Sequence, residues 1–199
     1  MSMTQDSSSA RIVSVHSSGT HDFSKQHRAS IRLLAGFGVE GDAHAGRSDQ
    51  HLFHIKRFGQ HPNLRQFHLI QAELFDVLAT HGFDVPPGAL GENARTTGVD
   101  LLALPARTRL HVGPGAIIEI TGLRNPCVQI ERFRPGLLAH LVERSDKGLV
   151  RKAGVMSVVL NSGEVAPHDK IEIELPKGPF EPLTYLVPDP VMRGRLAQA

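Results

Sequence analysis

The sequence predicts a mainly β protein of the α+β class, in which short strands form a closed β-barrel and a few short helices flank it. Three observations support this prediction. Apolar residues make up 40% of the chain and charged residues 21%, which is ordinary for a globular domain. Short β-type runs recur between turn residues. Closing such strands into a barrel removes the exposed edges that an open sheet leaves.

Seven runs have the composition of strands, because each is rich in β-branched and apolar residues and is bounded by Gly, Pro, Asn or Asp. They are residues 12–15, 31–34, 67–70, 108–112, 116–120, 155–160 and 171–175. The last run alternates strictly between apolar and acidic side chains. That alternation predicts a strand with one buried and one exposed face.

Helices are expected at residues 71–81 and 136–144, where apolar side chains recur on one face. The first of these runs meets Gly82, which is a typical C-terminal stop. A further short helix is expected at residues 128–133. The helices are few beside the strands, so they are expected to flank the barrel.

A chain of 199 residues suits a single domain. Residues 1–10 are polar and rich in serine, which predicts a disordered N-terminal tail. Residues 11–175 contain the barrel domain. Residues 176–199 are predicted to form a Pro-rich extension. This extension is expected to have an extended backbone, and either to pack on the barrel or to trail from it.

The formal net charge is only +2 and no Lys/Arg-rich run occurs, which argues against nucleic acid as a partner. No apolar stretch approaches the roughly 20 residues of a membrane span, so no membrane association is expected. The first residues do not have the pattern of a secretory signal. Because the one cysteine excludes an intrachain disulfide, the sequence predicts a cytoplasmic protein.

A first glycine-rich loop, residues 36–46, places Asp42 and His44 among four glycines. Such a loop lets backbone N–H groups approach an anion, while the two side chains supply an acceptor and a donor. The alternative is an ordinary turn between strands.

A second glycine-punctuated loop spans residues 88–100 and contains Glu92, Asn93 and Thr96. The amide and hydroxyl groups can hydrogen bond to a polar heterocycle, although they suit turns and helix caps equally well.

The third loop carries Arg124, Asn125 and Cys127 and precedes the predicted helix at 128–133. A cysteine at a helix N-terminus, three residues after an arginine, is in a setting that favours its thiolate. This chemistry suits a metal ligand or a sulfur nucleophile. A small buried hydrophobic residue is the alternative, but the polar loop argues against it.

Histidines are frequent, and His51 and His54 could share one helical face that binds zinc. No paired-cysteine or HExxH pattern accompanies them, so surface histidines are the preferred interpretation.

The three loops, in this order, resemble the MOSC family, which is named from the C-terminal domain of molybdenum cofactor sulfurase. The likeness rests on a G-x-x-G-D-x-H motif ending at His44, a G-E-N motif ending at Asn93 and an R-x-P-C motif ending at Cys127. It covers about residues 12 to 175. The chain is most similar to the small stand-alone bacterial members.

The resemblance implies a β-barrel with a pterin-dithiolene molybdenum cofactor. It implies that Cys127 is catalytic as the thiolate ligand of the metal, and that Asp42 lies near the metal, where it could orient a water or relay a proton. The remaining loop residues are then expected to bind the cofactor, namely His44, Arg47, Glu92, Asn93, Thr96, Arg124 and Asn125.

Related members reduce N-hydroxylated compounds, so the leading hypothesis is a molybdenum-dependent oxidoreductase acting on a small N-hydroxylated substrate. The chain has no flavin or iron–sulfur motif, so a separate reductase must donate the electrons. A sulfur carrier with a persulfide on Cys127 is the second hypothesis, because a reactive thiolate serves that role equally well. The third is a non-catalytic ligand-binding barrel.

Overall fold

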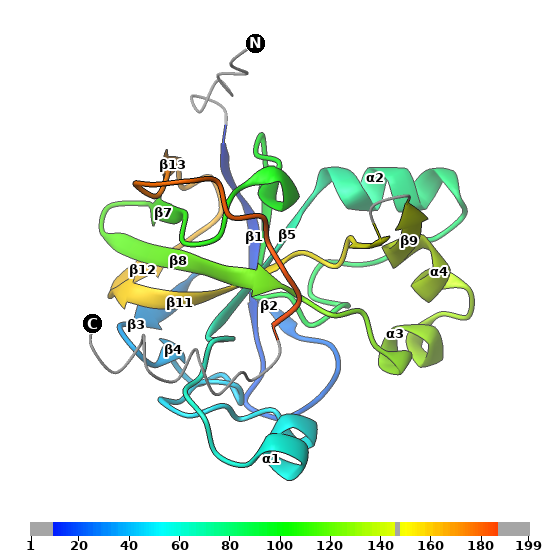
Figure 1. Cartoon of the computed structure of the whole chain (residues 1–199), viewed down its shortest axis with the longest axis horizontal. Helices are drawn as coiled ribbons and strands as arrows, with labels where there is room; N and C mark the ends of the chain where they lie inside the picture. Colours follow the sequence, from blue (N-terminus) through cyan, green and yellow to red (C-terminus); the bar gives the residue numbers. More distant parts are fainter. Residues whose placement is uncertain (1–9, 146–147, 187–199) are drawn as a thin grey trace.

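The computed structural model describes residues 10–145 and 148–186 (Figure 1). Its main component is an eight-stranded sheet in the order β13-β7-β8-β11-β5-β6-β1-β2. Neighbouring strands are antiparallel, except that β5 and β6 run parallel. The strands are β1 (Arg11–Ser17), β2 (Gln26–Arg28), β5 (Phe67–Gln71), β6 (Ala94–Thr97), β7 (Arg109–Val112), β8 (Ala116–Leu123), β11 (Val155–Asn161) and β13 (Ile171–Glu174).

Two smaller sheets and several short helices surround the main sheet. The small sheets pair β12 (Gly163–Val165) with β3 (Ile31–Leu34) and β4 (Gly38–Val39), and β10 (Gly148–Arg151) with β9 (Val142–Ser145). The helices are α1 (Leu52–Phe58), α2 (Glu73–Thr80), α3 (Val128–Phe133) and α4 (Leu137–Leu141), with a 3-10 turn at Leu101–Ala103. In Figure 1, α2, α3 and α4 lie to one side of the sheet, and α1 lies apart from them at the lower end.

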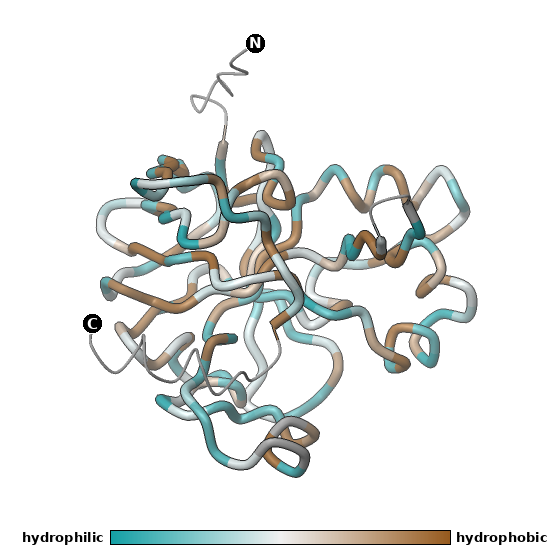
Figure 2. Tube along the Cα trace, viewed as in Figure 1, coloured by the Kyte–Doolittle hydropathy of each residue, from teal (hydrophilic) through white to brown (hydrophobic). Residues whose placement is uncertain are grey.

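Two main hydrophobic cores hold these elements together. The larger core joins the eight-stranded sheet to the three-stranded sheet and includes Leu33, Phe67 and Ile118, none of which is exposed. The other core lies beneath α2, α3 and α4 and includes Leu78 and Ile130. Burial alternates strictly along β8, as expected for a strand with one face on the core. Figure 2 shows the hydrophobic stretches of β8 and β11.

The mainly β architecture with flanking helices is confirmed, but the predicted closed barrel is not found. The strand ladders leave β13 and β2 at the two ends of the main sheet. An isolated bridge between Arg11 and Lys170, with backbone hydrogen bonds between residues 10–12 and 168–171, links β1 to the start of β13, but no ladder forms between the two strands. The free edge of β1 is divided, because its residues 15–17 pair with β2. Too little of that edge remains for a ladder with β13.

All seven predicted strands are present, and α3 has the predicted bounds. The helix expected at 136–144 is too long, since α4 ends at Leu141 and β9 begins at the next residue. The predicted N-terminal tail lies outside the described residues except for Ala10, as does the predicted extension beyond residue 186.

The final described segment, residues 181–186, packs against the end of β8. The Leu123 N–H donates to the Thr184 carbonyl at 2.9 Å, and Leu123 forms a parallel bridge with Tyr185. Leu186 is buried. This contact brings Tyr185 beside the loop that follows β8.

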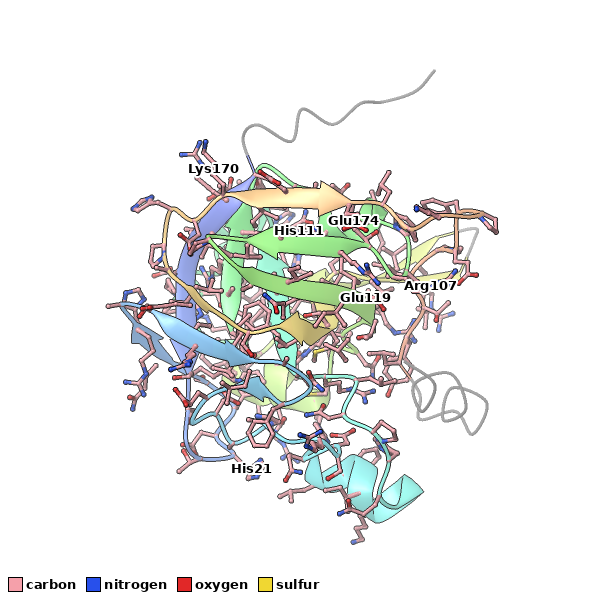
Figure 3. The ribbon with its side chains drawn as sticks, turned by 90° about the vertical axis from the view of Figure 1, so that its left-hand side faces the viewer. His21, Arg107, His111, Glu119, Lys170 and Glu174 are labelled. Atoms are coloured by element: carbon pink, nitrogen blue, oxygen red, sulfur yellow. The ribbon has the colours of Figure 1, made fainter. Side chains whose placement is uncertain are left out.

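Exposed ion pairs cover the outer face of β7, β8 and β13 (Figure 3). Arg109 contacts Glu119 at 3.2 Å, and His111 contacts Glu174 at 2.8 Å. Ion pairs between solvent-exposed side chains contribute little to stability, so these pairs keep the face polar more than they stabilise it. His21 lies at the opposite, α1 end in the same view. No helix among the described residues is long and apolar enough to cross a membrane.

Candidate functional site

The three glycine-rich or polar loops converge on one pocket of about 610 Å³. His44 lines it from the first loop, Asn93 from the second, and Arg124, Asn125 and Cys127 from the third. This volume is in the range of pockets that bind small molecules and cofactors. The grouping predicted from the sequence is therefore present in space.

Cys127 is held at the pocket wall where β8 ends and α3 begins. The Arg124 N–H donates to the Gly154 carbonyl at 3.0 Å, and the Ile130 N–H donates to the Cys127 carbonyl at 3.0 Å. These two bonds fix the ends of the loop. The Cys127 thiol is half-buried and lies 3.6 Å from Gln129 Oε1.

Arg124 is the cation of the third loop, and it lines the pocket together with Cys127. Burial lowers the pKa of Arg124 below its ordinary value, and the charges of Cys127 and Glu92 offset part of that effect. Its Nη1 is buried and has no hydrogen-bond partner among the described residues. A buried guanidinium with a donor to spare favours an anionic group beside it.

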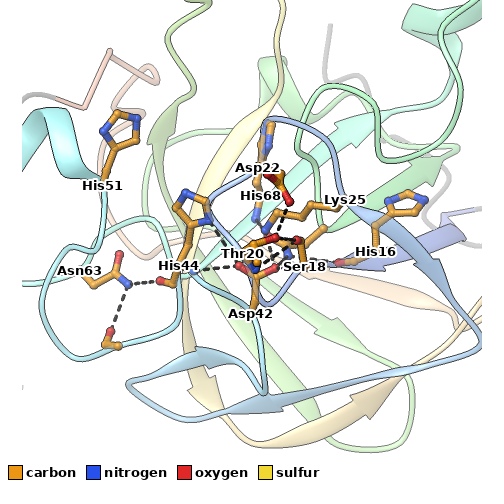
Figure 4. Close-up of polar contacts among 12 residues, drawn as sticks. His16, Ser18, Thr20, Asp22, Lys25, Asp42, His44, His51, Asn63 and His68 are labelled. Carbon is orange, nitrogen blue, oxygen red and sulfur yellow. Dashed lines mark hydrogen bonds and ion pairs between the residues drawn. The ribbon is translucent and has the colours of Figure 1, made fainter. Parts of the chain in front are cut away.

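Asp42 is the centre of a buried network behind the pocket wall (Figure 4). Its Oδ2 accepts from Lys25 Nζ at 2.6 Å, from Asn93 Nδ2 at 3.1 Å and from the Ser18 N–H at 3.3 Å. Its Oδ1 accepts from the His44 N–H at 3.0 Å and lies 3.4 Å from His44 Nδ1. Both carboxylate oxygens are therefore fully engaged by the protein.

The network keeps Asp42 ionised. Burial alone would raise the pKa of Asp42, but hydrogen bonds from His44 and the charge of Lys25 outweigh burial and hold that pKa below its ordinary value. Burial lowers the pKa of Lys25, and Asp42 opposes that effect. Asp42 is not among the residues that line the pocket, so it anchors the wall and does not face a ligand.

Asn93 reaches the pocket, but its amide is largely occupied. Its Nδ2 donates to the His16 carbonyl at 3.2 Å as well as to Asp42, and its Oδ1 accepts from the His68 N–H at 3.2 Å. The side chain therefore ties β1, the first loop and β5 together. Its two donors are not available to a ligand.

Three residues predicted to bind the cofactor do not line the pocket. Glu92 is fully buried and accepts from two N–H groups of the turn at residues 88–90, at 2.8 and 3.0 Å, and from Arg95 Nε at 2.8 Å. Thr96 is buried within β6. Arg47 is exposed, and its backbone carbonyl accepts the Asn63 N–H at 3.0 Å.

Sequence reasoning missed several residues of the wall, including Lys25, Arg65, His68 and Tyr185. His68 lies in β5, and its Nε2 is 2.8 Å from the Ala153 carbonyl. Burial lowers the pKa of His68 to about 3, so the ring is neutral and its Nε2–H donates to that carbonyl. None of these four belongs to a glycine-rich loop, so no pattern in the sequence marked them.

Histidine rings gather at one part of the pocket. The ring centroids of His21 and His44 are 5.2 Å apart, and those of His44 and His51 are 6.5 Å apart. Within the described residues, no three His, Cys, Asp or Glu side chains are arranged to hold a metal ion. The zinc site considered for His51 and His54 has no support, and the side chain of His54 is outside the description.

A family model for the MOSC domain matches residues 43–172, well over half of the chain. The chain belongs to the MOSC domain family. No curated protein matches it. Among solved structures, the YuaD protein from Bacillus subtilis is similar with a TM-score of 0.70 and 22% identity, over 84% of this chain and 97% of that one.

Two structures of YiiM are also similar. The protein from Geobacillus stearothermophilus matches with a TM-score of 0.59 and 16% identity, over 83% of this chain and 75% of that one. The protein from Escherichia coli matches with a TM-score of 0.58 and 17% identity, over 86% of this chain and 73% of that one. At these identities the likeness shows a shared MOSC fold, so the chemistry must be argued from the pocket itself.

Proposed function

We propose that this MOSC protein binds a molybdenum cofactor in the pocket, with Cys127 as the sulfur ligand of the metal. The observation that carries the proposal is that Cys127 and Arg124 line the same pocket, where Arg124 Nη1 is buried and has no hydrogen-bond partner among the described residues. A soft thiolate suits a metal that is already held by sulfur. A single reduced cysteine in this role suits the cytoplasm.

The other wall residues fit such a ligand. Arg124 and Asn125 lie beside the thiol and offer donors to anionic or polar groups, while Leu90, Met156 and Tyr185 supply apolar surface on which a flat heterocycle can lie. The pocket therefore combines one thiol, a buried cation and an apolar wall.

The reaction that we propose is the reduction of a small N-hydroxylated compound. The N–O bond breaks, two electrons and two protons are taken up, and an N–H group and water are released. The bound cofactor supplies a two-electron metal centre that can accept an oxygen atom. A separate reductase supplies the electrons. The chain holds the thiol beside Arg124 and excludes bulk water with its apolar wall.

The test replaces Cys127 by serine and by alanine. Both variants should lose bound molybdenum and turnover of N-hydroxylated bases by more than about 100-fold, because neither side chain offers a soft ligand. The thermal unfolding of both, measured without cofactor, should stay close to that of the cofactor-free wild type, because the thiol is only half-buried. Molybdenum content, pterin fluorescence and reductase-coupled turnover are measured on one preparation. Full turnover in either variant would remove Cys127 from the mechanism.

A sulfur carrier is the second candidate, and the half-exposed thiol favours it. A persulfide on Cys127 needs access to a donor and an acceptor, which a pocket-wall position allows. Mass spectrometry after incubation with a sulfur donor decides between the two. A stable, transferable extra sulfur on Cys127 in protein that holds no molybdenum would favour the carrier.

A further inference from the structure

We propose that His44 carries protons to the substrate in this pocket, and that Asp42 and Lys25 are positioning residues that hold its ring in the Nδ1–H tautomer. The inference rests on the proposed function for the proton step. It replaces the sequence-based expectation that Asp42 itself relays a proton.

Asp42 is unsuited to proton transfer. It accepts four hydrogen bonds from the protein, two of them from Lys25 and Asn93 side chains. Its side chain is only 2% exposed, and it does not line the pocket. A carboxylate that is ionised, fully bonded and screened from the ligand cannot deliver a proton to it.

His44 has the complementary properties. Its side chain is 33% exposed and lines the pocket. Its Nδ1 lies 3.4 Å from Asp42 Oδ1, which also accepts the backbone N–H of the same histidine. A carboxylate oxygen can only accept, so the negative charge of Asp42 at 3.4 Å favours a proton on Nδ1. In the neutral ring this leaves the lone pair on Nε2, on the side away from Asp42.

Lys25 sets the orientation of the carboxylate. Its Nζ, the Asn93 amide and the Ser18 N–H all converge on Oδ2, so Oδ1 is left for His44. The Lys25 side chain is 5% exposed and provides the buried positive charge that an ionised buried Asp42 requires. Two further titratable groups, His21 and His51, face His44 at the ring distances given above.

This arrangement has a defined task in the proposed reaction. Reduction of an N-hydroxylated group consumes two electrons and two protons for each water released. With Nδ1–H held by Asp42, Nε2 can take a proton from solvent and pass it to the oxygen that leaves the nitrogen. General acid catalysis of this kind contributes about 10²–10⁴-fold.

The decisive variant is Asp42→Asn. Three donors converge on the Oδ2 position, so the amide oxygen takes that place and the NH₂ group takes the Oδ1 place. There the NH₂ group replaces the acceptor of the His44 backbone N–H and can donate to His44 Nδ1, so the neutral ring should carry its proton on Nε2. Imidazole ¹⁵N NMR of the purified full-length protein, assigned with His44→Gln, should show the Nδ1–H tautomer in the wild type and the Nε2–H tautomer in Asp42→Asn.

Lys25→Met tests the second positioning residue. Loss of the buried ammonium should raise the pKa of Asp42 toward its ordinary value, as followed by the ¹³C signal of its carboxylate. Lys170→Met, at an exposed lysine outside the pocket, is the matched control and should leave that titration unchanged. Thermal unfolding of each variant shows whether it is folded.

Activity is measured on the same variants with molybdenum content determined for each. His44→Gln and Asp42→Asn should retain molybdenum, and their kcat should fall by about 100-fold or more. The pH profile of kcat should also lose the part that depends on an imidazole. An unchanged tautomer in Asp42→Asn, or a wild-type kcat and pH profile in molybdenum-loaded His44→Gln, would overturn the inference. A wild type without molybdenum or turnover would instead overturn the proposed function and, with it, the proton step. Whether Asp42 positions the His44 ring is decided by the NMR measurements alone.

Discussion

Single buried polar residues define the wall of this pocket, and His68 is the clearest case. The ring is 5% exposed, and its Nε2 bonds to the Ala153 carbonyl. Burial, helped by the charge of Arg124, lowers the pKa of His68 to about 3. The folded protein therefore excludes a proton that the unfolded chain binds near pH 6.5.

This difference predicts an acid-dependent loss of stability. Between pH 6.5 and 3 the unfolded state binds more protons at residue 68 than the folded state, so the free energy of unfolding falls as the pH falls. The slope from this residue is up to about 1.4 kcal/mol per pH unit. Burial also lowers the pKa of His16, so this residue likewise makes the free energy of unfolding fall as the pH falls. Asp42 contributes only at lower pH, because its ordinary pKa is 3.8.

His68→Gln checks the prediction, because the glutamine amide can still donate to the Ala153 carbonyl without titrating. Urea unfolding at pH 7, 6 and 5 should give a shallower dependence in the variant than in the wild type. The two curves should run parallel above pH 7. Equal slopes between pH 6 and 5 would show that the ring is not neutralised by burial.

At the scale of elements, the sequence predicted the strands that contain an apolar run, including the fully buried stretch of β5, and missed strands without one, such as β6. The residues of β8 alternate, and the strand was predicted. In β6, three successive residues from Ala94 to Thr96 are buried, and the polar Arg95 and Thr96 made this parallel strand resemble a loop. The helix expected at 136–144 stops early because Val142 starts a strand that pairs with β10.

The same limit applies to the site. His44 and Cys127 belong to sequence motifs, so the sequence predicted that both residues bind the same ligand. Lys25 and His68 are isolated polar residues, and only the packing of β1, β5 and the first loop brings them to the wall. Glu92 stands in a motif as well, but its carboxylate serves the turn at 88–90. A sequence motif therefore does not distinguish a residue that contacts a ligand from one that supports the backbone around it.

The packing of β11 on β5 depends on Gly154, which predicts a strong effect of a single methyl group. Gly154 has φ +85°, and a Cβ there would lie 2.1 Å from the Leu69 carbonyl oxygen. Gly154→Ala should therefore lower the free energy of unfolding by about 3 kcal/mol or more. It should also weaken cofactor binding, because the Gly154 carbonyl accepts the Arg124 N–H.

Gly82 is a matched control for this substitution. Its φ is +82°, but a Cβ there meets nothing within 4 Å. Gly82→Ala should therefore show the strain of the left-handed backbone alone, about 1–2 kcal/mol, with no effect on the pocket. Denaturant unfolding compares the two. Equal losses would mean that the contact with the Leu69 carbonyl relaxes freely.

For the whole molecule, the pocket is the place where distant parts of the chain meet. Its lining residues run from His21 in the N-terminal part to Tyr185 in the last described segment, with His68 and Cys127 between them. The loops that carry these residues are joined to β1, β5, β8 and β11, which form one sheet. A ligand in the pocket therefore contacts the beginning, middle and end of the described fold at once.

A ligand that binds only the folded state stabilises it by about 2.7 kcal/mol when its free concentration is 100 times its Kd. For a chain of this length, each kcal/mol raises Tm by about 2–4 °C. Protein loaded with the molybdenum cofactor should therefore melt about 5–10 °C above the cofactor-free form. Cys127→Ser should lose most of this difference while its cofactor-free Tm is unchanged.

Hydrogen exchange then tests how the stabilisation is distributed. Because the ligand contacts all the converging loops, the amides near Lys25, Asn93 and Cys127 should become protected together on loading. Protection confined to the Cys127 loop would mean that the cofactor sits at the mouth and does not engage the Asp42 network. In that case, loading should leave the tautomer and the mobility of His44 unchanged. The same exchange experiment would thereby separate a ligand that fills the pocket from one that only touches its thiol.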